Sequence, residues 1–374
     1  MSAPPIVRAW STAREPEVLV RELVLQLAQS GVSPAGLFLF RGTGYEDEAL
    51  GRALREAFSC PVASCTTAGE ILDDYLDHGA VAVAFSSRHF AIRQLAIPDL
   101  RGFDFRRLPG MARACLDAPA LPGARAFGVL LVDGLSVSEE SLVGQIYSAF
   151  QGMPLIGGSA GDGLQFARTR VYCDGTYREN AATFTVVESL LPFEIFRVQH
   201  FTPSQQDLVI TRSDPHRRIV YEIDGAPAAA QLARLLGLRV EELNPQTFSK
   251  HPMMLQIGED WYVRSIQKVN PDGSLSFFCA IDDGLPLTVA SGVGLVDTLA
   301  REVDRIEHEF KRVHLTLGVD CILRRLEIEE KGLRAEVSPL LQRLRFAGFS
   351  SYGEQIRSLH VNQTLTAVTI GERC

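Results

Sequence analysis

Residues 36–70 read GLFLFRGTGYEDEALGRALREAFSCPVASCTTAGE, and residues 128–162 read GVLLVDGLSVSEESLVGQIYSAFQGMPLIGGSAGD. The two segments have the same length and align without a gap, so that both begin with glycine and both end in a carboxylate. In each copy the carboxylate follows a turn of small residues. A duplication of this kind indicates two related turns that surround one site.

Each copy has the same local pattern. An apolar run (GLFLF or GVLLV) predicts a buried strand, which passes through a glycine-containing loop into an amphipathic helix. A second apolar run leads into the turn, and a further apolar run (AVAVAF or AATFTVV) follows it. Continuous apolar strands that alternate with helices are typical of a sheet covered by helices. The sequence therefore predicts the α/β class, with an N-terminal domain built from a strand–helix–strand duplication.

The composition changes near residues 200–215, where the chain becomes polar and rich in turn residues. We therefore expect two mixed α/β domains, over residues 1–205 and 206–374. The second domain contains a weaker echo of the repeat, because residues 351–354 (SYGE) again form a turn with glycine and a carboxylate after an apolar stretch.

Charge and composition exclude several classes of protein. A net charge of −8 and a pI of about 5.6 do not suit nucleic-acid binding, which needs a basic face. No apolar run reaches the roughly 18 residues of a membrane-spanning helix, and the first residues (MSAPPIVRAW) do not form a signal peptide. The seven cysteines include no CxxC pair, which favours reduced thiols over a zinc site. We expect a cytoplasmic protein without a membrane span.

The three turns hold the residues that we expect to bind a ligand. Glycine permits positive φ angles and a close approach of a ligand to the main chain, and successive free N–H groups would hold a carboxylate. In the opposite interpretation, these are tight connections in which only glycine packs. Because polar residues recur beside the glycines, we favour a ligand site. The candidate residues are Thr67, Gly69, Glu70, Gly157, Gly158, Ser159, Gly161, Asp162, Tyr352, Gly353 and Glu354.

No catalytic residue is predicted. Gly157, Ser159 and Gly161 match the GxSxG pattern of a nucleophile elbow, but such an elbow leads from a strand into a helix. The sequence that follows (LQFARTRVYCDG) predicts a strand instead. The first copy carries Thr67 in place of the serine, so we expect a binding protein rather than an enzyme.

Several ordered motifs resemble the FIST family of sensory proteins. They are SCTTAGE, PLIGGSAGDG, YEIDGAPA, HPMMLQIG, WYVRSIQ, SSYGEQ and HVNQT, and they extend over nearly the whole chain. The resemblance implies an N-terminal and a C-terminal FIST module. A chain with both modules and no attached output domain is most similar to the nitric-oxide-sensing FIST haemoproteins of bacteria.

The resemblance to these haemoproteins implies haem b as cofactor, with nitric oxide at the iron and a haem propionate at the N–H groups of the glycine turns. A haem iron needs an axial side chain, most often His, and we expect His360, which adjoins the third turn, as this metal ligand. The second choice is His251, which lies beside a proline and two methionines. The sensor would signal to a histidine kinase of a two-component system, or to a cyclic-di-GMP synthase or hydrolase, and assembly as a homodimer is left open.

The residues also allow a FIST sensor of an amino acid or another small metabolite, without haem. In that case Glu70, Asp162 and Glu354 would bind an amino group, and the N–H groups of the glycine turns would bind a carboxylate. A purely structural adaptor is the remaining alternative, and it predicts that bulky substitutions in the turns leave partner binding unchanged.

Overall fold

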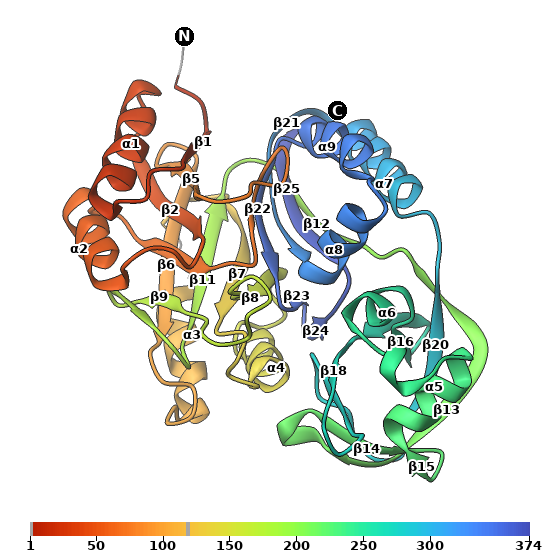
Figure 1. Ribbon diagram of the computed structural model, residues 1–374. Helices are drawn as coiled ribbons and strands as arrows, with labels where there is room; N and C mark the ends of the chain where they lie inside the picture. Colours follow the sequence, from red (N-terminus) through yellow and green to blue (C-terminus); the bar gives the residue numbers. More distant parts are fainter. Residues whose placement is uncertain (1–2, 117–119) are drawn as a thin grey trace.

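The computed structural model describes residues 3–116 and 120–374 of the chain. It confirms the α/β class, because helices pack on three sheets of mixed strand direction and on a fourth sheet whose strand pairs are antiparallel. Figure 1 shows three of the sheets around a common centre and the fourth, coloured green to teal, to one side of them.

The first three sheets have the same strand order. From edge to edge, the first consists of β1 (Ile6–Ser11), β5 (Ala80–Ser86), β2 (Pro34–Arg41), β3 (Val62–Thr66), β9 (Val171–Cys173) and β10 (Thr176–Arg178). The second consists of β6 (Phe90–Ile97), β11 (Ala182–Ser189), β7 (Arg125–Val132), β8 (Leu155–Ser159), β23 (Glu354–Ile356) and β24 (Leu359–Val361). The third consists of β12 (Phe193–Val198), β25 (Leu365–Arg373), β21 (Phe310–Cys321), β22 (Phe346–Ser351) and β4 (Glu70–Leu72).

A parallel pair lies inside each sheet: β2 with β3, β7 with β8, and β21 with β22. After each turn the chain crosses into a neighbouring sheet. The first unit adds β4 to the third sheet, the second adds β9 to the first sheet, and the third adds β23 to the second sheet. The exchange is cyclic, so the weaker C-terminal echo is the third copy of one unit.

Helices cover the three sheets. The helices of the three units are α1 (Pro16–Gln29), α2 (Asp47–Ala57), α3 (Leu108–Leu116), α4 (Glu139–Ala149), α7 (Leu295–Glu309), α8 (Ile322–Glu330) and α9 (Arg334–Arg343). Phenylalanine rings join the sheets at the centre: Phe40 of β2 lies 4.8 Å from Phe349 of β22, between ring centroids.

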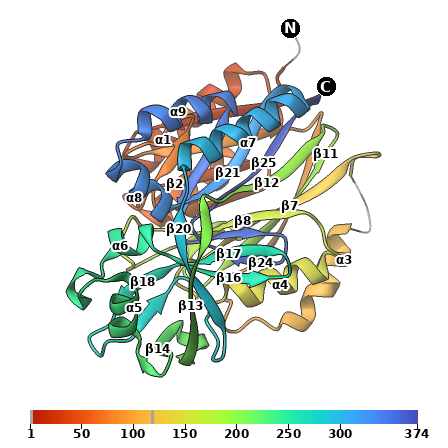
Figure 2. The same cartoon turned by 90° about the vertical axis from the view of Figure 1, so that its right-hand side faces the viewer.

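The fourth sheet lies between β12 and α7 in the sequence, and the expected boundary near residue 205 falls in its first strand. Its strands are β13 (Phe201–Asp214), β14 (Ile219–Ile223), β15 (Ala226–Pro227), β16 (Met253–Ile257), β17 (Asp260–Arg264), β18 (Ile266–Val269), β19 (Leu275–Phe277) and β20 (Pro286–Gly292), with helices α5 (Ala228–Leu236) and α6 (Pro245–Lys250). We call residues 201–292 the inserted region. Figure 2 shows it below the third sheet, connected through β13 and β20.

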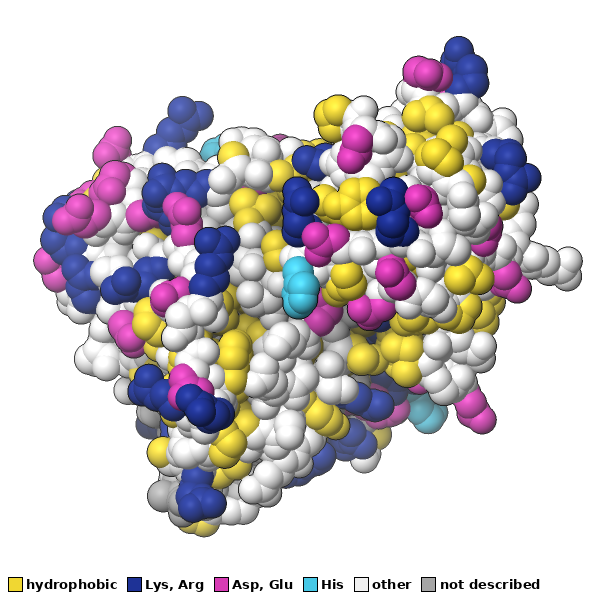
Figure 3. All heavy atoms as spheres, turned by 90° about the horizontal axis from the view of Figure 1, so that it is seen from below, with side chains coloured by type: hydrophobic (Ala, Val, Ile, Leu, Met, Phe, Trp, Pro, Cys, Tyr) yellow, Lys and Arg dark blue, Asp and Glu magenta, His cyan; other side chains and the backbone are white. Residues whose placement is uncertain are grey.

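Charged side chains of both signs alternate over the molecular face in Figure 3. Such a mixed surface agrees with the acidic net charge.

Candidate functional site

The three turns lie against one another where the three sheets meet. Backbone hydrogen bonds join them in a ring: Gly161 N donates to Thr66 O (3.1 Å), Ala68 N to Ser350 O (2.8 Å) and Tyr352 N to Ser159 O (3.2 Å). The structure thus places the residues predicted from the three turns around one point.

The strand pairing shows which carboxylates are equivalent. Each exchanged strand begins at the same position opposite its neighbour: Glu70 begins β4, Glu354 begins β23 and Val171 begins β9. Glu70 and Glu354 are therefore counterparts, and the second unit has valine in their place. The gapless alignment puts Asp162 there instead, because it does not account for the extra loop 163–170.

Six N–H groups of the three turns donate to partners within the protein. Besides the bonds between the turns, Gly69 N donates to Thr67 Oγ1 (3.1 Å), Ser159 N to Gly353 O (2.8 Å) and Asp162 N to the Tyr352 hydroxyl (3.3 Å). The expectation that these groups are free to bind a carboxylate or a haem propionate is wrong.

Close packing explains three of the predicted glycines. An added Cβ would lie 2.5 Å from a backbone oxygen at Gly157, 2.5 Å from an aromatic ring at Gly158 and 2.2 Å from His360 at Gly353. These distances are far below van der Waals contact, so the glycines permit the strands and turns to approach one another.

In the third unit the carboxyl group is closed in by the protein. Glu354 is fully buried and accepts hydrogen bonds from Ser351 Oγ (2.6 Å), Thr364 N (3.1 Å) and Thr364 Oγ1 (2.8 Å). Burial raises the pKa of Glu354 to about 8, since the charged form loses its hydration. This carboxyl group has its partners without any ligand.

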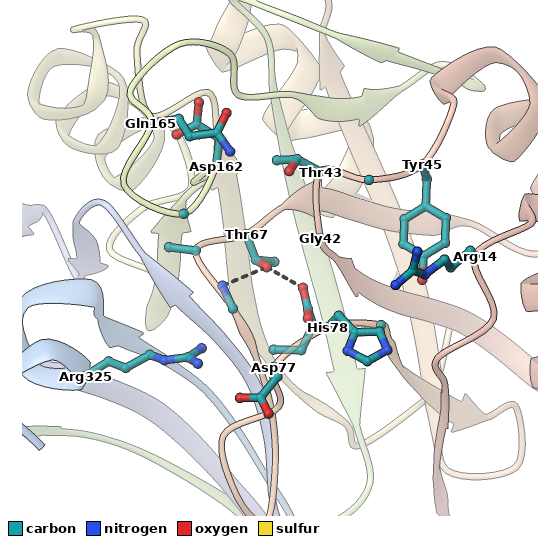
Figure 4. Close-up of a pocket in the computed structure, with 16 residues that line it drawn as sticks. Arg14, Gly42, Thr43, Tyr45, Thr67, Asp77, His78, Asp162, Gln165 and Arg325 are labelled. Atoms are coloured by element: carbon teal, nitrogen blue, oxygen red, sulfur yellow. Dashed lines mark hydrogen bonds between the residues drawn. The ribbon is translucent and has the colours of Figure 1, made fainter. Parts of the chain in front are cut away.

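In the first unit the equivalent carboxyl group faces a cavity. Glu70 accepts from Thr67 Oγ1 (2.5 Å), the one side chain of the described residues that donates to it. Gly42 N donates to Gly79 O as Cys321 N donates to Thr364 O in the third unit, so Gly79 stands where Thr364 closes the other site. A cavity of about 430 Å³ opens beside Glu70 (Figure 4).

Charged and aromatic side chains form the walls of this cavity, and Figure 4 shows them around Thr67. Arg325 of α8 reaches in from the third unit, with its Nη1 1.7 Å from the place that a Cβ of Gly69 would take. Its guanidinium also pairs with Glu329 (2.7 Å). Burial raises the pKa of Glu70 to about 7, while Thr67, Arg325 and other partners oppose the shift.

Comparison with known families agrees with the motifs. The FIST N domain matches residues 35–226, and the FIST C domain matches residues 228–357. The chain belongs to the FIST family. FIST domains are sensory domains that bind small ligands in signal transduction. No curated protein matches the chain.

In this FIST protein the carboxylate of Asp162 binds the backbone of the loop 163–170. It accepts from Phe166 N (2.9 Å), Ala167 N (2.8 Å) and Arg168 N (2.7 Å), and also from the Tyr352 hydroxyl. The loop that it holds forms one wall of the cavity, which Asp162 and Gln165 line.

His360 connects the FIST core to the inserted region. Its Nδ1 lies 3.1 Å from Gln355 Nε2 and its Nε2 lies 3.2 Å from Phe278 O. The ring is buried, and this burial lowers its pKa. The neighbouring Gln363 donates to Ser249 O (3.2 Å), again in the inserted region. The HVNQT motif thus forms a contact between two parts of the protein.

His251 and Ser159 lie apart from the cavity. His251 is exposed at the C-terminal end of α6, and it is not among the residues that line the cavity beside Glu70. Ser159 is fully buried in β8, and the chain continues into a loop rather than a helix. The geometry of a nucleophile elbow is therefore lacking at Ser159.

The sequence interpretation missed several residues of the site. Arg325 belongs to the third unit and reaches the cavity through strand exchange, which no local pattern reveals. Gly79 takes the place of a threonine of the third unit, but this equivalence follows from the strand pairing in the structure and not from a local sequence pattern. Tyr45 lies in the loop after the first strand of the repeat. The repeat pattern draws attention to the glycine of this loop and not to the tyrosine.

The described residues contain neither a cluster of metal ligands nor a membrane-spanning helix. No three His, Cys, Asp or Glu side chains within residues 3–116 and 120–374 lie close enough together to hold a metal ion. In the same part of the chain, every helix is too short or too polar to span a bilayer.

Proposed function

We propose that this FIST protein is a signal-transduction sensor whose small ligand binds in the cavity beside Glu70. One observation carries the proposal: two equivalent buried carboxyl groups differ in that Glu354 is saturated by the protein and Glu70 is not. A buried polar group with unused hydrogen-bonding capacity in a cavity is a typical binding determinant.

The chemistry of Glu70 favours a ligand with a hydrogen-bond donor, such as the amino group of an amino acid or another small metabolite. A protonated amine would pair with the ionised carboxylate and form a charge-assisted hydrogen bond. By family resemblance, the ligand state would reach a histidine kinase or a cyclic-di-GMP synthase or hydrolase in the cytoplasm.

Haem b with nitric oxide is the other hypothesis from the resemblance, and the residues fit it poorly. Both ring nitrogens of His360 have partners inside the protein, so neither is directed at an iron. His251 is exposed and does not line the cavity beside Glu70. Absorption spectra after addition of hemin, reduction and exposure to nitric oxide test this hypothesis, with His360→Ala and His251→Ala as variants.

Calorimetric titration with a panel of amino acids tests the proposed site. We expect a bound amino acid to lose about tenfold in affinity in Glu70→Gln, since a charged hydrogen bond contributes roughly 1.5–3 kcal/mol. Glu354→Gln is the matched control, because it replaces the equivalent buried carboxyl group, and it should bind as the wild type does. Equal losses in both variants, or none in Glu70→Gln, would contradict the assignment.

A further inference from the structure

We propose that the ligand is a dipolar compound whose cationic and anionic groups are several bonds apart, with the cation beside Glu70 and the anion in an adjoining cavity. The inference rests on the proposed function, because it assigns the second end of the same ligand. It follows from the walls and the charges of the two cavities.

The second cavity has a volume of about 570 Å³ and shares part of its wall with the first. The residues that line both are Thr43, Tyr45, Asp162 and Gln165, and Figure 4 shows them along the upper side of the first cavity. Glu70 lines only the first cavity. A ligand that extends past Tyr45 would therefore reach both.

Three arginines of the second cavity share two carboxylates. Asp47 pairs with both Arg41 and Arg170. Glu179 pairs with Arg168 and lies 3.5 Å from Arg170. Arg41 is only 1 % exposed, and its Nε has no hydrogen-bond partner among the described residues. The group of five side chains keeps one positive charge in excess and a buried donor without an acceptor.

The other two acids on this cavity are held by backbone groups. Glu46 accepts from Glu48 N (3.0 Å) and Ala49 N (2.6 Å) at the start of α2, where the helix dipole compensates its charge. Asp162 accepts three N–H groups of its own loop. Neither carboxylate pairs with an arginine, whereas Arg41 also acts on Glu70, where its charge opposes the burial that raises the pKa of that carboxyl group. An anionic ligand group is the partner that would complete the hydrogen bonds of the arginines that line the second cavity.

The cations of the first cavity offer a weaker anion site. Arg325 already pairs with Glu329 on its own helix, and Arg14 is exposed at the rim, where water screens its charge. In an α-amino acid both charged groups are bonded to one carbon atom, whereas Glu70 lines only the first of the two cavities and Arg170 only the second. A ligand with separated charges can reach both.

A series of ω-amino acids measures this separation directly. Glycine, 4-aminobutanoate, 6-aminohexanoate and 8-aminooctanoate are titrated into the full chain by calorimetry, with hexylamine and hexanoate as probes that carry one charge. We expect the affinity to pass through a maximum above glycine, at least about tenfold tighter than for either single-charge probe. In Arg170→Gln the best member should bind no better than hexylamine, and in Glu70→Gln no better than hexanoate.

Arg178→Gln is the matched control, since Arg178 is an exposed arginine of β10 in the same sheet that lines neither cavity; it should bind as the wild type does. Equal affinity for glycine and the longer members, or unchanged binding in Arg170→Gln, overturns the dipolar ligand. If Glu70→Gln still weakens binding in that case, the proposed function stands. If Glu70→Gln binds every probe as the wild type does, both proposals fail.

Discussion

The first and third units place a glutamate at the same position of an exchanged strand, yet only one of the two opens to a cavity. Glu354 is enclosed by Ser351 and Thr364. Glu70 keeps the bond that corresponds to Ser351, from Thr67, but has Gly79 where the threonine stands in the other unit. The comparison teaches that one missing side chain converts a structural carboxyl group into a candidate binding group.

The backbone conformation and the packing at Gly79 both require a glycine. Its φ is +131°, a conformation that side chains disfavour, and an added Cβ would lie 2.5 Å from Ser11 O. A threonine at this position would therefore strain the strand ends, so the first unit cannot simply acquire the closed arrangement. The open cavity is a consequence of how β1 and the chain before β5 pack.

The largest effect should come from pH. Both glutamates have raised pKa values in the folded state, about 7 for Glu70 and about 8 for Glu354. A raised carboxyl pKa stabilises the fold fully below its unfolded value, and this stability is lost as pH rises through the folded value. We expect the free energy of unfolding to fall from pH 4.5 to 8, with roughly 3 kcal/mol from Glu70 and more from Glu354.

Urea unfolding at several pH values measures this dependence. Glu70→Gln should make the curve of unfolding free energy against pH less steep up to about pH 7, and Glu354→Gln should make it less steep up to about pH 8. If both variants show the same pH dependence as the wild type, neither carboxyl group is buried as described.

Truncation should separate the two sites by stability. Glu354→Ala leaves the donors of Ser351 and Thr364 buried without an acceptor, so we expect a loss of about 3 kcal/mol. Glu70→Ala removes a group with one side-chain partner from an existing cavity, and we expect about 1 kcal/mol. Unfolding midpoints in urea give both values, and equal losses would contradict the distinction between a closed and an open site.

A smaller effect isolates the threonine. Thr364→Val keeps the shape and the backbone N–H but removes the hydroxyl that binds Glu354, which should cost about 1 kcal/mol. Thr43→Val is a fitting control, because Thr43 is an exposed residue at the cavity and should stay within about 0.5 kcal/mol of the wild type. Thermal unfolding of the two variants side by side decides the matter; a Thr364→Val protein as stable as the control would speak against the bond.

The smallest effect on stability should come from Gly42→Ala, which moves the first unit towards Cys321 of the third. The added Cβ would lie 3.8 Å from Glu70 Oε1, an ordinary contact, so the stability should change by less than about 0.5 kcal/mol. The methyl group occupies part of the cavity, and amino acid binding should weaken severalfold in calorimetry. Unaltered binding would place the ligand elsewhere.

Local patterns predicted the repeated unit and the meeting of the turns, because apolar runs, helix spacing and glycines act over short distances. They could not predict the strand exchange, which depends on pairing between residues far apart in the chain. For the same reason the gapless alignment pairs Asp162 with Glu70, although the carboxylate of Asp162 binds N–H groups of the extra loop 163–170. His360 lies near a turn in the sequence, yet its ring contacts the inserted region.

Carbon-13 NMR of the glutamate carboxyl groups tests the central claim most directly. The protein is labelled at glutamate, Glu70 and Glu354 are assigned through the two Gln variants, and a pool of amino acids is added during a pH titration. The account predicts that the Glu70 resonance shifts and that its pKa falls below about 7, because a bound cation favours the carboxylate, while Glu354 is unchanged. Movement of both resonances, or of neither, would contradict it.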